Sequence, residues 1–107
     1  MDIETNGAKF TAAFIFEPGT YDDEFHELDA QIDAYAKSLD GYVKTERWGS
    51  DDGKIRNSVY YFKNREAIAL LARFEPHRIA KKNYAKWYKG YRIEVSEITQ
   101  IYGDGNL

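Results

Sequence analysis

Hydrophobic and polar residues alternate along the chain in a pattern that predicts four strands and two helical regions. Residues 9–16 are apolar in both registers of an extended segment, and residues 42–48, 54–62 and 91–95 have the period of two that is typical of strands. From Phe25 to Leu39 the apolar residues instead recur at steps of three and four, which predicts an amphipathic helix.

Residues that favour turns and helix ends lie between these segments. Thr20, followed by three acidic residues, predicts the start of the first helix, and Gly41 predicts its end. The residues from Gly49 to Gly53 suit a turn, so the strands on either side should form an antiparallel hairpin. Asn64 is expected to cap a second, short helix that extends to about Phe74.

A basic and aromatic stretch follows, from Arg73 to Val95. Pro76 suits the first turn of a new helix, with Glu75 as a weak cap, and Gly90 is expected to end that helix. The last strand should then begin at Tyr91 and contain a bulge near residues 96–98, where the alternation shifts phase. One face of the predicted helix carries residues at steps of three and four: His77, Ala80, Tyr84 and either Trp87 or Tyr88.

The order of these elements, strand–helix–strand–strand–helix–strand, is that of the ferredoxin-like α+β fold. Right-handed crossovers would place both helices on one face of a four-stranded antiparallel sheet. With 107 residues, the chain is expected to form one domain, with a core over residues 9–101 and loose tails at both ends. The bare sheet face would still carry apolar side chains, so we expect a homodimer that covers it.

Composition and charge disfavour several classes of function. A net charge of −3 leaves no basic surplus for nucleic acid, and the absence of cysteine excludes thiolate metal sites and cysteine nucleophiles. The sequence shows neither a signal peptide nor an apolar run of membrane-spanning length, so a cytoplasmic protein is expected. Acidic residues concentrate between positions 22 and 40 and basic ones between 73 and 92, which predicts two neighbouring helices of opposite charge, with a functional basic patch as the alternative.

Three runs of the sequence together resemble the antibiotic biosynthesis monooxygenase family. They are residues 59–67 (VYYFKNREA), 76–81 (PHRIAK) and 86–95 (KWYKGYRIEV). The resemblance covers about residues 9–101. It implies a dimeric α/β barrel with a small-molecule pocket between helices and sheet in each protomer. Some members of that family oxygenate electron-rich aromatic substrates with O2 and no cofactor, whereas relatives degrade haem. The resemblance therefore implies a cofactor-independent monooxygenase that acts on a small aromatic or polyketide-like substrate.

Such a reaction needs a base that forms the substrate anion and a dry apolar pocket in which the anion meets O2. His77 is the candidate base, because burial and the nearby Arg73, Arg78 and Lys81 should keep its imidazole neutral. A structural role for His77, as a capping or packing residue at the helix start, is equally open. The candidate pocket residues are Tyr60, Tyr84, Trp87 and Tyr91, with Arg56 or Arg47 to hold a phenolate or carboxylate. The aromatic residues alternatively belong to the core or to a dimer interface.

Three other functions of the same fold compete with this one. A non-catalytic ligand-binding or structural dimer is the main alternative, which the sequence does not separate from an enzyme. Haem degradation has less support, because the first strand lacks the asparagine of haem-degrading relatives, with Asn6 lying before it, and Leu71 stands about where their tryptophan is expected. An RNA-recognition module would stack bases on aromatic residues of the first and third strands, namely Phe14, Phe16, Tyr60 and Phe62, but the acidic balance opposes it.

No cofactor is predicted. The sequence has no glycine-rich phosphate loop, and its two histidines lie about fifty positions apart without a carboxylate at ligand spacing. His26, on the acidic helix, is expected to be solvated.

Overall fold

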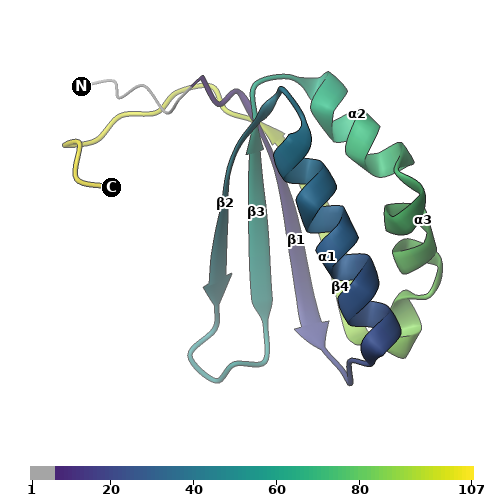
Figure 1. Cartoon of the computed structure of the whole chain (residues 1–107). Coiled ribbons are helices and arrows are strands. Elements are labelled where there is room, and N and C mark those ends of the chain that lie inside the picture. The colour runs from purple at the N-terminus through teal and green to yellow at the C-terminus, as the bar shows by residue number, and fades with distance from the viewer. Residues whose placement is uncertain (1–6) are drawn as a thin grey trace.

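The computed structural model describes residues 7–107, and their strands and helices follow the predicted order (Figure 1). Asn6 and most of the predicted N-terminal tail lie outside the described residues. Within residues 7–107, every helix is too short or too polar to span a lipid bilayer. The elements are β1 (Phe10–Pro18), α1 (Asp23–Ser38), β2 (Tyr42–Gly49), β3 (Arg56–Phe62), α2 (Arg65–Arg73), α3 (Glu75–Lys82), the 3₁₀ turn η1 (Tyr84–Lys86) and β4 (Tyr88–Glu97).

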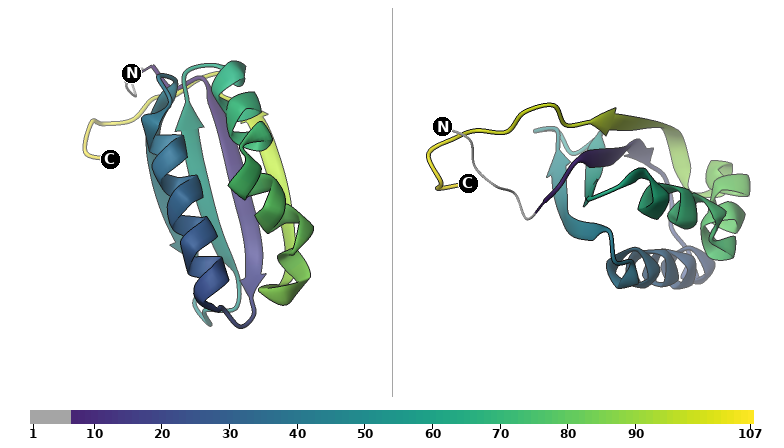
Figure 2. Two further views of the ribbon diagram at one scale, coloured as in Figure 1. Left: turned by 45° about the vertical axis from the view of Figure 1, so that its right-hand side comes forward. Right: turned by 90° about the horizontal axis from the view of Figure 1, so that it is seen from above.

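The four strands pair in the order β2-β3-β1-β4, and every neighbouring pair is antiparallel. This is the ferredoxin-like arrangement that the element order predicted. The two views in Figure 2 show α1 and the α2–α3 pair on the same side of the sheet. The sheet therefore has a helix-covered face and an open face, as expected from right-handed crossovers.

Side chains of the preceding turns cap α1 and α2. The amide of Phe25 donates a hydrogen bond of 2.8 Å to Oδ1 of Asp22, so the cap of α1 is Asp22 and the prediction of Thr20 is wrong by two residues. Its carboxylate also places negative charge at the positive end of the helix dipole. Asn64 caps α2 as predicted, because its Oδ1 accepts a 2.9 Å hydrogen bond from the amide of Ala67.

A cluster of buried core residues lies where α1 ends and α2 begins. Ala36 and Phe62 are fully buried there, next to Ala67 and Leu71. Gly41 allows this close approach, because a Cβ at its position would lie only 2.9 Å from the Cβ of Ala67. The opposite end of the sheet, where α1 begins and β4 starts, is left to larger aromatic side chains.

The long helix predicted from Pro76 to Gly90 is wrong. Helix α3 ends at Lys82, where the Asn83 side chain bends back and donates a 2.9 Å hydrogen bond to the carbonyl of Ile79. The η1 turn follows, and β4 begins at Tyr88, which pairs with Pro18, instead of at Tyr91. Aromatic spacing that continued past Asn83 imitated a helical stripe across a helix end.

The register of the sheet shifts at two places. In the β1–β4 pair the shift lies between Glu17 and Pro18, so the bulge predicted near residues 96–98 is at the other end of the pair. In the β2–β3 pair it lies between Tyr42 and Lys44. This second shift leaves Tyr42 opposite Phe62 and places Lys44 opposite Tyr61, on the open face.

The open face is apolar along its middle and charged along its edges. Its central strands contribute Ile15, Val59 and Tyr61, whereas the edge strands contribute charged side chains. The hydroxyl of Tyr61 donates a 2.8 Å hydrogen bond to Oε1 of Glu46. Trp48, at the end of β2, is 63% exposed. The open face thus exposes apolar side chains to solvent in the single chain.

Candidate functional site

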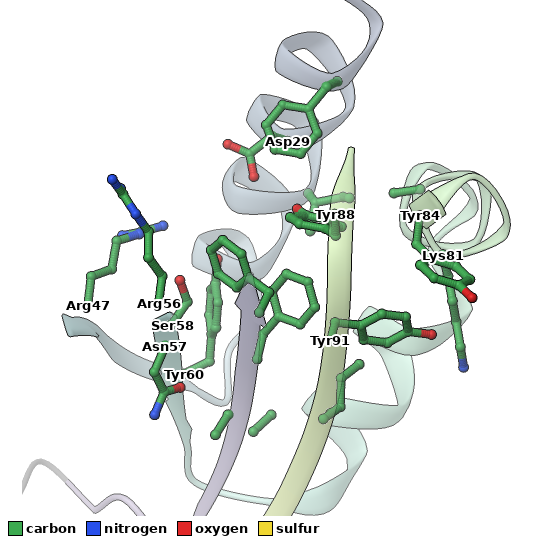
Figure 3. Close-up of a pocket in the computed structure, with 18 of the residues that line it drawn as sticks. Asp29, Arg47, Arg56, Asn57, Ser58, Tyr60, Lys81, Tyr84, Tyr88 and Tyr91 are labelled. Atoms are coloured by element: carbon green, nitrogen blue, oxygen red, sulfur yellow. The ribbon is translucent and has the colours of Figure 1, made fainter. Parts of the chain in front are cut away.

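A cavity of about 670 Å³ lies between the helices and the helix-facing side of the sheet. Its volume is in the range of small-molecule pockets. The residues that build it come from β1, α1, the β2–β3 hairpin, α3 and β4 (Figure 3). Those that carry its chemistry are Phe14, Phe16, Tyr21, Asp29, Arg47, Arg56, Tyr60, His77, Lys81, Tyr84, Tyr88 and Tyr91.

Aromatic rings form a continuous wall in this cavity. Phe14 and Phe16 share one side of β1 because they are two residues apart, and their rings stack with centroids 4.7 Å apart. Tyr88 meets both rings edge-on, at 5.2 Å and 5.1 Å. Tyr91 lies 5.8 Å from Phe14 and 4.9 Å from Tyr84. The wall offers faces and edges against which a flat aromatic molecule packs.

His77, in the first turn of α3, lines the cavity. Its Nδ1 is buried and has no hydrogen-bond partner among residues 7–107. Burial lowers the pKa of the imidazole below 6.5, and the ammonium group of Lys81, one turn along the helix, lowers it further. Arg73 and Arg78, which were also expected to act on this pKa, are not among its causes. The ring is therefore mostly neutral at pH 7.

Most of the predicted pocket residues line the cavity, namely Tyr60, Tyr84, Tyr91, Arg56 and its alternative Arg47. Trp87 does not. It is 1% exposed, and its indole Nε1 donates a 2.9 Å hydrogen bond to Oδ1 of Asp22. Because α3 ends early, Trp87 lies in the connection to β4 and packs edge-on against Phe25, 5.6 Å away, where it ties β4 to the start of α1.

Two of the cavity tyrosines, Tyr60 and Tyr88, keep their protons at neutral pH. Burial raises the pKa of Tyr60 to about 12, and the nearby Asp33 carboxylate contributes to the shift. The Tyr60 hydroxyl donates a 3.4 Å hydrogen bond to Oδ1 of Asp33. Burial also raises the pKa of Tyr88 well above its usual range. These phenols therefore act as neutral hydrogen-bond donors or packing surfaces and not as bases.

Asp29 also lines the cavity, although it was not predicted there from the sequence. It stands on α1 one turn before Asp33 and faces the cavity (Figure 3). Asp33 forms an ion pair of 2.8 Å with Lys37. Burial alone would raise the pKa of Asp33, but Lys37 and Arg47 together lower it below its usual value. Asp29 has no ion pair within residues 7–107, and burial followed by the charge of Asp33 raises its pKa. An acidic residue between Phe25 and Ile32, on the apolar stripe of α1, was the available signal.

His26 is exposed, as predicted, yet it borders the cavity. Its ring lies edge-on to Tyr21 and Phe25, with centroid distances of 6.2 Å and 5.5 Å. It marks the rim of the site.

Solved structures of the same architecture include an oxygenase. The chain shares the fold of SnoaB. SnoaB is a cofactor-independent oxygenase of Streptomyces nogalater, and its structure matches with a TM-score of 0.69, 11% sequence identity and coverage of 91% of this chain and 99% of that one. A protein of Mycobacterium tuberculosis matches with a TM-score of 0.60 and 15% identity over 90% of this chain and 98% of its own. A Bacteroides thetaiotaomicron protein, described as a possible oxidoreductase, matches with a TM-score of 0.62 and 9% identity over 86% of this chain and 99% of its own.

These likenesses establish the fold, and at such low identity they leave the activity of this chain to its own residues. No family model matches the sequence, and no curated protein does. The fold also bears on the RNA-binding alternative. Phe14, Phe16 and Tyr60 line the cavity beneath the helices and Phe62 is fully buried, so none of these rings offers a stacking platform on the open face.

Proposed function

We propose that this protein is a cofactor-independent monooxygenase that binds a small aromatic substrate in the cavity and uses His77 as its base. The observation that carries the proposal is the buried, unpartnered Nδ1 of a neutral imidazole in the wall of an aromatic cavity. A group of this kind accepts a proton near neutral pH. The activity of SnoaB, which has the same fold, supports this reaction class.

In the proposed reaction, His77 takes the proton of a phenol, and the phenolate passes one electron to O2 in the water-poor cavity. The two radicals combine at a ring carbon into a peroxide anion, which takes the proton back from His77. The resulting hydroperoxide loses water together with the hydrogen of that carbon and leaves a carbonyl group. One oxygen atom of O2 enters the substrate and the other leaves as water. A phenol with a free para C–H thus becomes a quinone, and the substrate itself supplies the four electrons that reduce O2.

The proposed assembly is a homodimer that covers the open face of the sheet, because Ile15, Val59, Tyr61 and the exposed Trp48 are more apolar than a solvated surface needs. The cavity lies on the other side of the sheet, so each protomer would carry its own site.

The test uses 1-naphthol as the probe and measures O2 uptake and formation of 1,4-naphthoquinone by protein dialysed against a chelator. Wild type should turn over without added metal, flavin or haem. His77→Gln should lose activity by about 100-fold or more, which is the usual contribution of a general base, and should keep its fold. His26→Gln is the matched control, because that ring borders the same cavity at its exposed rim.

Full activity of His77→Gln would remove the proposed base. Binding of aromatic ligands without O2 uptake would favour the non-catalytic alternative. Stoichiometric haem or flavin absorbance in the purified protein would contradict a reaction without cofactor.

A further inference from the structure

The charged residues that line the cavity are mostly cations. The lining contains three basic side chains, Arg47, Arg56 and Lys81, and one carboxylate, that of Asp29. The whole chain, in contrast, carries a net charge of −3. Figure 3 shows Arg47 and Arg56 on one side of the central aromatic side chains and Lys81 on the other. The cavity is therefore a cationic pocket in an acidic protein, which attracts anions.

The two arginines belong to neighbouring strands and share one face of the hairpin. Arg47 on β2 pairs with Ser58 on β3, and Arg56 pairs with Gly49. Arg47 and Arg56 are thus diagonal neighbours, at a separation of roughly 7–8 Å that long side chains bridge. Ser58 lies beside them and lines the same end of the cavity.

These guanidinium groups have spare hydrogen-bonding capacity. Arg47 reaches Asp33 only through a long contact of 3.5 Å, whereas Lys37 holds the same carboxylate at 2.8 Å. Among residues 7–107, no carboxylate lies within ion-pair distance of Arg56. A guanidinium group presents several donors in one plane, which suits the two oxygens of a carboxylate.

We propose that the cavity selects aromatic carboxylates, with the carboxylate held by Arg56 and Arg47 at the hairpin end and the ring against Phe14 and Phe16. This orientation directs the far edge of the ring toward β4 and α3, the elements that carry Tyr91 and Lys81. The inference rests on the cavity being the ligand site of the proposed function, but it does not require catalysis.

The experiment compares two probes of nearly the same shape, 1-naphthoate and its neutral amide, 1-naphthamide, by calorimetric titration of the full chain. Wild type should bind naphthoate at least about tenfold more tightly, because only the anion forms charge-assisted hydrogen bonds with arginine. Added salt should weaken naphthoate binding and leave naphthamide binding nearly unchanged. Arg56→Gln should abolish the preference for the anion while keeping the affinity for the amide within about twofold.

Arg78→Gln is the control, since Arg78 is exposed on α3 and does not line the cavity. Thermal melts check that each variant is folded. Equal affinity for both probes, or binding of neither, would overturn the proposal, and so would a preference that Lys81→Gln abolishes and Arg56→Gln does not. Naphthoate binding without O2 uptake from any phenol would support this inference while contradicting the oxygenase, so the two proposals fail separately.

Discussion

Lys81 follows His77 by one helical turn, and its charge is the second cause, after burial, of the lowered imidazole pKa. A base works in its neutral form, so kcat/KM should fall as the pH drops through this pKa, which lies below 6.5. Lys81→Gln removes the nearby positive charge. The acid limb of the pH profile should therefore move to higher pH, yet stay below 6.5 because the burial remains.

The matched control is Lys82→Gln, since Lys82 is exposed and does not line the cavity. A measurement of kcat/KM against pH in all three proteins checks the expectation. An acid limb that is unmoved by Lys81→Gln, or moved equally by Lys82→Gln, would contradict the assignment of that limb to His77.

Asp29 offers a second test, through stability. A carboxyl group whose pKa is raised in the folded state favours folding below its unfolded pKa, and that contribution is lost as the pH rises through the folded value. At pH 7 the Asp29 carboxylate therefore opposes folding. Asp29→Asn should raise the melting temperature at pH 7, and the gain should vanish below about pH 4, where both states are protonated.

Asp33→Asn should instead lower the melting temperature at pH 7. The pKa of Asp33 is lowered by Lys37 and Arg47 against the effect of burial, so its stabilising contribution is present at neutral pH and lost as the pH falls through that lowered pKa. Thermal melts of both variants between pH 3 and 7 distinguish the two carboxylates. Similar shifts of the same sign would contradict the contrast in their environments.

At the scale of elements, the contact between the turn before α1 and the connection before β4 closes the aromatic end of the sheet. The amide of Gly19 donates a 2.7 Å hydrogen bond to the carbonyl of Trp87, and a Cβ on Gly19 would lie only 2.7 Å from that oxygen. Gly19→Ala should therefore cost about 1–3 kcal/mol of unfolding free energy, as overpacking does.

Gly90→Ala is the control for that substitution, because a Cβ on Gly90, in the neighbouring strand β4, meets nothing within 4 Å. Urea denaturation gives both values. Equal stability of the two variants would show that the connection moves freely.

The order of elements and the hairpin followed from the sequence because each boundary there has its own local signal. Asn64 caps α2 and Pro76 separates α2 from α3, so the break between the two helices was predicted. The end of α3 was not, because Asn83 is a weaker stop than glycine and the aromatic spacing continues beyond it. That error moved Trp87 into the predicted pocket.

The candidate site was predicted in part for the same reason. His77, Tyr84 and Tyr91 come from local patterns along α3, η1 and β4, and all three line the same cavity. Asp29 lies on a different element, and only the packing of α1 over the sheet brings it to the same cavity. Pairwise contacts of that kind, such as the one between Trp87 and Asp22, depend on the tertiary structure and leave no periodic trace in the sequence.

At the scale of the whole molecule, the open face of the sheet is the proposed site of self-association. Tyr61 lies in its middle, between Lys44 and Thr11 on the neighbouring strands. If this face pairs with a second copy, Tyr61→Asp buries an unpaired charge beside Glu46 and should weaken the dimer by roughly 100-fold or more. Phe14, in contrast, faces the cavity and is not a probe of the interface.

Sedimentation equilibrium at several protein concentrations measures this effect. Lys82→Asp is the control, because it also introduces a carboxylate, but at an exposed position on α3. A wild-type monomer at micromolar concentration would contradict the dimer, and equal association of both variants would place the interface elsewhere.

The contrast between the two tryptophans has an optical consequence. Trp87 is 1% exposed and hydrogen-bonded inside the protein, whereas Trp48 is 63% exposed at the end of β2. Their fluorescence should separate into a short-wavelength emission that resists acrylamide quenching and a long-wavelength emission that does not. Dilution or assembly should change the second signal and unfolding the first, so the unlabelled chain reports on its sheet surface and on its interior independently.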